Sequence, residues 1–513
     1  MNYKLLGKIL GKITVLESVM MLAPLAVSVI YREDLRHMLA FLIPAICLFI
    51  MGVLLQRPKP ERVSLVQKEG FALVASAWIF MTLFAAVPLV INGDIPNYVD
   101  ACFEMMSGFT TTGASIVSDI SVLSRSTLFW RSFSHWIGGM GILVFVLIFI
   151  PESNEGSAMH LLRAESPGPQ VGKITSKMKM TSLILYLIYA GLTLITFILL
   201  LLGGPVPGYE GDHVLFSLLT AFGAAGTGGF GVLPGSMELY SAYSQYVISI
   251  ALIVFGCNFA LYHLILIGKI KEVVKSEEFR TYLIIVLVAV LIIFTSLTTK
   301  IQTVVQDYTV EESFRHALFQ VASIMTTTGY STTDFGVWPP VCIATLVMLM
   351  FFGAMAGSTA GGIKLSRIVI AIKGIFINVR KLVNPRYVPK AKFESNTLER
   401  DTINDVFSFI TLYFFFITAV FFLLSFDPVN GQTFTIVSDA GSYEVTHGFF
   451  SNFSATLACI SNIGPGFEAV GPYASFAAFS PLSKILLAFT MLLGRLEILP
   501  VLILFSPKTW KKV

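Results

Sequence analysis

Apolar stretches long enough to cross a bilayer follow one another along almost the whole chain. A helix of about 20 apolar residues spans a hydrocarbon core of roughly 30 Å. Only 13% of the 513 residues are charged, against roughly 25% in an ordinary soluble domain. The sequence therefore predicts an all-α polytopic membrane protein with ten spans, near residues 13–31, 38–56, 70–91, 127–150, 181–203, 243–268, 280–298, 340–378 with an interruption, 402–425 and 480–505.

The positive charges indicate how these spans are oriented. Counted in alternate loops, 27 of the 35 Lys and Arg residues fall on one side, which the positive-inside rule assigns to the cytoplasm. Both termini are then cytoplasmic, as an even number of spans also requires. The opposite loops hold acids that either concentrate cations at an outer mouth or form an ordinary solvated surface: Asp94, Asp100, Asp119, Glu210, Asp212, Glu238, Asp307, Glu311, Glu312, Asp334, Asp427, Asp439 and Glu444.

A fourfold internal repeat runs from about residue 70 to residue 505. Each unit has an apolar span, a short amphipathic stretch, a Gly-rich turn and a second span. The first short stretch reads ACFEMMSGFTTTGAS (101–115), and the third reads ALFQVASIMTTTGYS (317–331) with TTTG in the same register. The second and fourth read VLFSLLTAFGAAGTGGFG (214–231) and GFFSNFSATLACISNIGPG (448–466). Similarity of this length indicates copies of one structural unit.

The topology of the repeat predicts the domain organisation. Every unit begins and ends on the cytoplasmic side, so the units are parallel, unlike the inverted repeats of many carriers. We expect four helix–pore-loop–helix units around a central pore, preceded by two extra transmembrane helices. The predicted boundaries are 1–69 for the N-terminal two-helix domain and 70–162, 163–272, 273–395 and 396–513 for pore repeats 1 to 4.

The Gly-rich turns are candidates for an ion filter. About ten helical residues rise roughly 15 Å, half of the hydrocarbon core, so each short helix ends inside the membrane. Irregular backbone at that depth is tolerated only where protein buries it or where it lines a water-filled cavity. Four such loops supply a ring of carbonyls that can replace the hydration shell of K+. The candidate residues are Thr110, Thr111, Thr112, Gly113, Gly226, Thr227, Gly228, Gly229, Thr326, Thr327, Thr328, Gly329, Ser461, Asn462, Ile463 and Gly464.

The last span of the third repeat contains a candidate gate. It runs over residues 341–355, breaks at AGSTAGGIK (356–364) and resumes at 365–379. Fifteen helical residues descend roughly 22 Å, so the break falls below the filter, where a flexible loop could obstruct the ion path or form a structural kink. The gating loop is placed at 353–366, and its candidate residues are Gly353, Gly357, Ser358, Thr359, Ala360, Gly361, Gly362 and Lys364.

Arg495 is a second candidate gate residue. It lies about fifteen residues into the final span, and a charge near the middle of a membrane is costly and by default functional. It would set a barrier to cations and pair with a carboxylate or with loop carbonyls, or else belong to a structural ion pair. Glu497 is two positions away and is expected on another face of the helix.

These motifs together resemble one family. FTTTGAS, GTGGF, TTTGYS and SNIGPG, with GAMAGSTAGGIK and GRLEILP, are similar to the membrane subunits of Trk-type potassium uptake systems, the TrkH/TrkG family of the Trk/Ktr/HKT superfamily. The resemblance covers the whole chain. It implies that K+ binds the filter carbonyls, that the loop of the third repeat is the gate, and that Arg495 lies near it.

The resemblance also implies partners and a location. Family members form homodimers in the bacterial inner membrane, and a cytosolic ring of TrkA-like nucleotide-binding subunits regulates them, so nucleotide would bind the partner and not this chain. Gly at all four filter positions accompanies potassium selectivity in the family. One departure is Gly226 with Ala224 and Ala225 in the second repeat, where relatives carry more hydroxyls.

The predicted function is gated potassium uptake driven by the membrane potential. One alternative is a symporter that couples K+ to H+ or Na+, which would need a titratable group in the ion path, and another is a less selective K+/Na+ pathway. A membrane-embedded enzyme is disfavoured, because the sequence shows no acid/base or nucleophile pair that converges at one depth.

Overall fold

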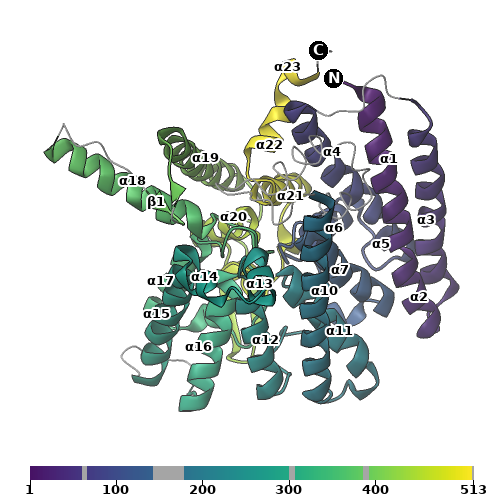
Figure 1. Cartoon of the computed structure of the whole chain (residues 1–513). Coiled ribbons are helices and arrows are strands. Elements are labelled where there is room, and N and C mark those ends of the chain that lie inside the picture. Colours follow the sequence, from purple (N-terminus) through teal and green to yellow (C-terminus); the bar gives the residue numbers. More distant parts are fainter. Residues whose placement is uncertain (60–65, 142–177, 300–306, 385–391, 395, 511–513) are drawn as a thin grey trace.

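The computed structural model describes residues 1–59, 66–141, 178–299, 307–384, 392–394 and 396–510. This part of the chain is mostly helical (Figure 1). The helices are α1 Tyr3–Met20, α2 Leu22–Ile30, α3 Leu35–Gln56, α4 Gln67–Ala85, α5 Val87–Asn92, α6 Tyr98–Phe109, α7 Arg125–Gly139, α10 Met178–Leu202, α11 His213–Gly226, α12 Ala242–Phe255, α13 Phe259–Leu266, α14 Ile270–Lys275, α15 Glu277–Thr299, α16 Val310–Met325, α17 Pro340–Phe351, α18 Leu365–Val383, α19 Arg400–Leu424, α20 Phe449–Ile460, α21 Pro481–Arg495, α22 Leu499–Leu502 and α23 Pro507–Trp510.

Two small antiparallel hairpins lie between the helices. The first pairs β1 Lys392–Phe393 with β2 Asn396–Thr397, and the second pairs β3 Thr433–Ser438 with β4 Gly441–Thr446. Short 3-10 turns occupy Ile120–Val122, Glu210–Asp212, Phe335–Val337, Glu468–Val470, Phe476–Ala478 and Ile503–Phe505.

The N-terminal helices α1, α2 and α3 form a separate layer on one flank (Figure 1). Gly11 of α1 and Gly52 of α3 face each other, because a Cβ on either residue would lie 2.7–2.8 Å from the carbonyl oxygen of the other. Small residues let two membrane helices approach closely and pack through their backbones. The two N-terminal spans predicted from hydropathy are therefore present as a packed pair, α1–α2 and α3.

Six helices of the described chain are long and apolar enough to cross a membrane, or eight if two bent pairs are each one span. The predicted spans 243–268 and 480–505 correspond to two bent pairs: α12 and α13 meet at 92°, and α21 meets the segment Leu499–Phe505 at 119°. The interrupted span near 340–378 is α17 and α18. The inner part of the span predicted at 127–150 and the repeat boundaries at 162 and 395 lie outside the described residues, and the domain division stays a prediction.

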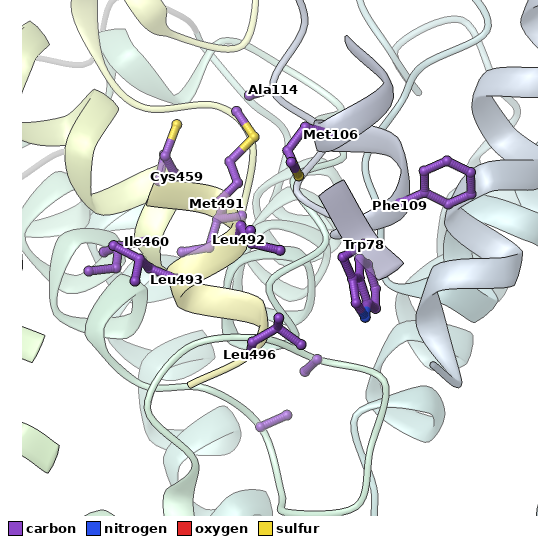
Figure 2. Packing of buried hydrophobic residues seen from close by; sticks show 14 of the residues in the cluster. Trp78, Met106, Phe109, Ala114, Cys459, Ile460, Met491, Leu492, Leu493 and Leu496 are labelled. Atoms are coloured by element: carbon purple, nitrogen blue, oxygen red, sulfur yellow. The ribbon is translucent and has the colours of Figure 1, made fainter. Parts of the chain in front are cut away.

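Four short helices, α6, α11, α16 and α20, are each followed by a second helix, respectively α7, α12, α17 and α21. Each second helix packs against its own short helix and against the short helix of the next repeat, and α21 closes the circle on α6. In Figure 2, Met491, Leu492 and Leu493 of α21 lie between Ile460 of α20 and Met106 of α6. This cyclic packing places the four short helices around one axis.

Glycines make the closest of these crossings possible. A Cβ on Gly138 of α7 would overlap the carbonyl oxygen of Phe109, the last residue of α6. A Cβ on Gly494 of α21 would overlap the carbonyl oxygen of Ile460, the last residue of α20. The same contact thus occurs in the first and fourth repeats, each time one residue before the candidate filter.

We expect the substitution Gly138→Ala to destabilise the protein by about 1–3 kcal/mol, because the added methyl group forces α7 away from α6. The check is the thermal unfolding of detergent-solubilised protein. Gly191→Ala in α10 is the matched control, since a Cβ there meets nothing within 4 Å. Equal melting temperatures for the two variants would contradict the packing described here.

Candidate ion-conduction site

The four candidate filter segments have one backbone conformation. In each, the second residue lies in the left-handed region, which few residues other than glycine adopt. The φ angles are 55° for Thr111, 51° for Thr227, 55° for Thr327 and 56° for Asn462. The four segments that were matched by sequence are therefore also matched in structure, residue by residue.

The left-handed residue belongs to a helix cap that recurs four times. The next residue donates its backbone N–H to the carbonyl five positions earlier, as in a Schellman motif. These bonds are Thr112 to Ser107 at 2.9 Å, Gly228 to Gly223 at 2.9 Å, Thr328 to Ser323 at 2.8 Å and Ile463 to Ala458 at 2.8 Å. Each short helix therefore ends at its filter segment, and the backbone beyond it is released from helical hydrogen bonding.

The last Gly of each segment closes the four segments into a ring. A Cβ on Gly113 would lie 2.7 Å from the backbone nitrogen of Gly229, and a Cβ on Gly229 would overlap the carbonyl oxygen of Thr328. A Cβ on Gly329 would likewise overlap the Ile463 carbonyl, and one on Gly464 would lie 2.7 Å from the Thr112 carbonyl oxygen. Each segment touches the next in the order 1, 2, 3, 4 and back to 1. Only glycine leaves enough space for backbone to meet backbone in this way.

The ring of glycines separates two cavities. The outer cavity has a volume of about 210 Å³, and all four ring glycines contribute to its wall. The inner cavity is smaller, about 70 Å³. It is lined by Gly139, Met140, Gly141, Gly357, Ser358, Ala360, Gly361, Gly362, Lys364, Gly494, Arg495 and Glu497. The sequence-predicted filter thus lies between an outer vestibule and the sequence-predicted gate residues.

The loop over 353–366 lies against the inner side of the ring. Gly361 donates its N–H to the hydroxyl of Thr327 at 2.7 Å, and a Cβ on Gly361 would be 2.7 Å from the carbonyl oxygen of Ser461. Gly357 accepts a hydrogen bond from the N–H of Phe259 at 3.0 Å. Gly353 donates to the carbonyl of Ile363 at 2.7 Å, which ties the two ends of the loop together. The loop contacts the second, third and fourth repeats.

Arg495 joins this loop to the filter. Its guanidinium donates to the hydroxyl of Thr111 at 3.2 Å and to the carbonyl of Thr359 at 2.9 Å. It also donates to the carbonyls of Gly138 and, at 2.8 Å, Gly139. Of these four acceptors the Thr359 carbonyl belongs to the loop, as expected from the sequence, and the carbonyls of Gly138 and Gly139 belong to the end of α7. One side chain therefore connects the first repeat, the gating loop and the fourth repeat.

A tight turn explains why the final span bends immediately after Arg495. Glu497 and Ile498 have φ angles of 59° and 64°, and Leu499 donates its N–H to the carbonyl of Glu497 at 2.7 Å. Such a γ-turn at a β-branched residue is rare and strained. Strain of this kind persists only where the surroundings impose it, and it gathers at functional sites. Hydropathy does not reveal the turn, because Ile498, Leu499, Val501 and Leu502 suit an apolar span, but Pro500 is a signal in the sequence that a straight helix is interrupted here.

Charged residues hold the two ends of the loop, and sequence reasoning missed Glu278 and Arg367 among them but included Lys364. One oxygen of Glu278, on α15, accepts the N–H of Ala356 at 2.9 Å and the N–H of Ser366 at 3.0 Å. Arg367 of α18 forms a buried ion pair with Glu497. Lys364 donates to the carbonyl of Ala360 within the loop. Glu278 is the second residue of an apolar helix, so its sequence position looks like an ordinary membrane boundary.

Many of the outer acids have structural partners. Asp100 pairs with Lys484 at 2.7 Å, Asp212 pairs with Arg125 at 2.7 Å, and Asp427 accepts from the Ser480 hydroxyl at 2.6 Å. Hydrogen bonds from the backbone and hydroxyl of Thr309 hold the pKa of Glu312 below its usual value. These acids therefore have structural roles in capping helices and in joining the loops to neighbouring helices.

Comparisons with known proteins agree with the motifs. The family model named TrkH, described as a cation transport protein, matches residues 37–512. The chain is 30% identical to the Trk system potassium uptake protein TrkG of Escherichia coli over 98% of this chain and 97% of the relative. It is 31% identical to the Trk system potassium uptake protein TrkH of Vibrio parahaemolyticus over the full length of both chains.

The crystal structure of the potassium transporter TrkH from Vibrio parahaemolyticus superimposes on the whole chain with a TM-score of 0.83 at 28% identity, and all of both chains is covered. The resemblance and the all-α membrane fold predicted from the sequence are thereby confirmed. The chain belongs to the TrkH family of cation transport proteins.

Proposed function

We propose that this chain is the ion-translocating subunit of a potassium uptake system in the bacterial cytoplasmic membrane, with both termini inside. The observation that carries the proposal is the closed ring of four glycine-containing segments between two cavities. The relatives' names, Trk system potassium uptake protein, support potassium as the cargo.

In this proposal the filter works through its backbone. Carbonyls of the residues from Thr110 to Gly113 and of their counterparts in the other repeats replace the water shell of K+ as it leaves the outer cavity. The ring glycines keep side chains out of the axis. Uptake follows the membrane potential, which supplies about 2.3 kcal/mol per charge at 100 mV.

The loop over 353–366 acts as the gate, and Arg495 acts as its latch. The loop and the guanidinium occupy the space directly below the ring, and a fixed positive charge there opposes the passage of a cation. Opening requires the bonds from Arg495 to Thr359 and from Gly361 to Thr327 to break. Regulation comes from the cytoplasmic side, where α18 continues from the end of the loop.

The partners in the proposal are a second copy of this chain and a cytosolic TrkA-like subunit that binds the nucleotide. The relatives are named as parts of a "Trk system", which indicates that further protein components exist. The basic end of α18, with Arg380 and Lys381, and the hairpin β1–β2 are the parts nearest to such a subunit. Coupled symport with H+ or Na+, and a less selective K+/Na+ pathway, are the alternatives that flux measurements distinguish.

Proteoliposomes that hold the purified chain are expected to take up K+ and Rb+ down a gradient faster than Na+. Gly329→Asp is expected to abolish uptake of all three, because its side chain would collide with the backbone of Ile463. Gly208→Asp is the matched control, since this outer glycine also has a positive φ but no atom within 4 Å of its Cβ position. A K+ flux that changes with an imposed proton gradient would favour the symporter, and equal Na+ flux would favour the less selective pathway.

Arg495→Ala is expected to raise K+ flux through the isolated chain by about tenfold or more, because each hydrogen bond to a charged group contributes about 1.5–3 kcal/mol to the closed loop. Lys484→Ala is the control, because Lys484 lies on the same helix but pairs with Asp100 at the outer side. Unchanged K+ flux in Arg495→Ala would contradict the proposal that Arg495 holds the loop closed.

Glu278→Ala is expected to raise K+ flux in the same assay, because both ends of the loop lose their shared acceptor. Glu278→Gln retains a carbonyl oxygen at this place and is expected to stay near the wild-type flux. Glu277→Ala, which removes the half-exposed partner of Lys373 at the preceding position, is the control. Equal effects of the substitutions at 277 and 278 would show that the helix end, and not the loop contact, matters.

A further inference from the structure

The second helix of the first repeat differs from the other three at two buried positions. These positions lie seven and eleven residues after the helix N-caps Ser124, Ser241, Pro339 and Ser480. In the first repeat they are Arg131 and His135. In the other repeats the corresponding residues are apolar and fully buried: Ile248 and Leu252, Leu346 and Met350, Leu487 and Met491.

Arg131 forms a buried ion pair behind the first filter segment. Its Nε donates to Glu104 at 2.8 Å, and the two side chains are 1% and 0% exposed. Glu104 also accepts the hydroxyl of Ser115 at 2.9 Å and the N–H of Ile116 at 3.0 Å. Because Ser115 follows Gly113 by two residues, the pair fixes the chain where it leaves the first filter segment. A buried charge whose partner is removed is strongly unfavourable, so this geometry is firmly held.

The same side chains reach the second filter segment through Phe230, which follows Gly229. The guanidinium carbon of Arg131 lies 4.2 Å from the centre of the Phe230 ring, an arrangement that attracts the cation to the ring face. The His135 ring lies 4.3 Å from the same ring, and its Nε2 accepts the N–H of Phe230 at 3.3 Å. His135 Nδ1 is 2.7 Å from the carbonyl of Gly108, so a neutral imidazole with the proton on Nδ1 satisfies both contacts.

These contacts lie beside the ion path. Arg131 contributes to the wall of the outer cavity together with the four ring glycines. Its Nη1 has no hydrogen-bond partner among the described residues. At the place of Glu104 the other short helices have Ser217, Gln320 and Ser451. The polar contacts from Arg131 and His135 therefore link only the first two segments.

We propose that Glu104, Arg131 and His135 form a clamp that fixes the first and second filter segments relative to each other, and that this clamp determines the preference for K+ over Na+. The proposal rests on the proposed function of the ring. A smaller ion draws carbonyls inward, so a ring accepts Na+ only if its segments can move. The clamp resists that movement at the boundary between the first and second filter segments. Glu104, Arg131 and His135 are positioning residues, since they act through the backbone and not on the ion.

The test uses ion binding, which does not require an open gate. The melting temperature of the purified full-length chain is titrated with KCl and with NaCl, since an ion that binds the folded state raises it. The ratio of the half-saturating Na+ and K+ concentrations measures selectivity. We expect Glu104→Gln to lower this ratio by about tenfold or more while saturation by K+ persists, which a general loss of stability would not produce.

Asp100→Asn is the matched control. Asp100 lies one turn before Glu104 on α6 and also forms an ion pair, with Lys484, but at the outer surface. We expect this variant to keep the wild-type ratio. A wild-type ratio in folded Glu104→Gln, or an equal drop in Asp100→Asn, would overturn the clamp. Absence of any K+ effect on the wild-type chain would instead count against the proposed function.

Two milder variants keep the test decisive if Glu104→Gln does not fold. Phe230→Leu retains an apolar side chain but removes the ring that Arg131 and His135 contact, and His135→Gln retains a hydrogen-bonding group of similar reach. Both variants are expected to lower the ratio of the half-saturating Na+ concentration to the half-saturating K+ concentration. Met350→Leu and Met491→Leu, at the equivalent positions of the third and fourth repeats, are expected to leave it unchanged. The opposite pattern would overturn the proposal.

Discussion

The rest of the structure depends on how the protein satisfies polar backbone in the middle of a membrane. Four short helices of 12 to 16 residues are too short to cross a bilayer, and peptide groups exposed inside one cannot pair with water. Each end is closed by the same cap, with a left-handed residue and a hydrogen bond that spans five residues. The cap leaves a short stretch of non-helical backbone, and four such stretches can be buried only against one another. The ring of Gly113, Gly229, Gly329 and Gly464 is the result.

Close packing between helices also determines where the filter segments lie. Gly138 and Gly494 allow α7 and α21 to touch the last carbonyls of α6 and α20, so backbone contact fixes the positions of the first and fourth filter segments. The second helices then end directly below the ring. Breaks at Gly256, Gly353 and Arg495 in three of the repeats bring non-helical chain to the same level. The loop over 353–366, the proposed gate, is therefore the longest of these interruptions on one side of the glycine ring.

The four filter segments share one backbone conformation, but the side chains around them differ. The backbone of the filter must be symmetric, since four matched segments share one axis. The side chains around the filter can differ between repeats, and the polar differences are concentrated at three residues. Arg131 and His135 contact the first and second filter segments on the side of the larger cavity. Arg495 links the first and fourth repeats on the side of the smaller cavity. The side-chain contacts that break the fourfold symmetry therefore lie on both sides of the glycine ring.

The sequence by itself determined the features that depend on local pattern. Hydropathy gave the spans, repetition gave the register of the four filter segments, and the Gly-rich run at 356–364 located the loop. These follow from composition and spacing along the chain, which act over tens of residues. The tertiary structure alone decided which distant groups meet: Glu278 with both ends of the loop, Arg367 with Glu497, and Arg131 with Glu104 and Phe230. The bends after Phe255 and Arg495 also escaped sequence reasoning, because a hydropathy window of about 20 residues averages over single interruptions such as Asn258, Glu497 and Pro500.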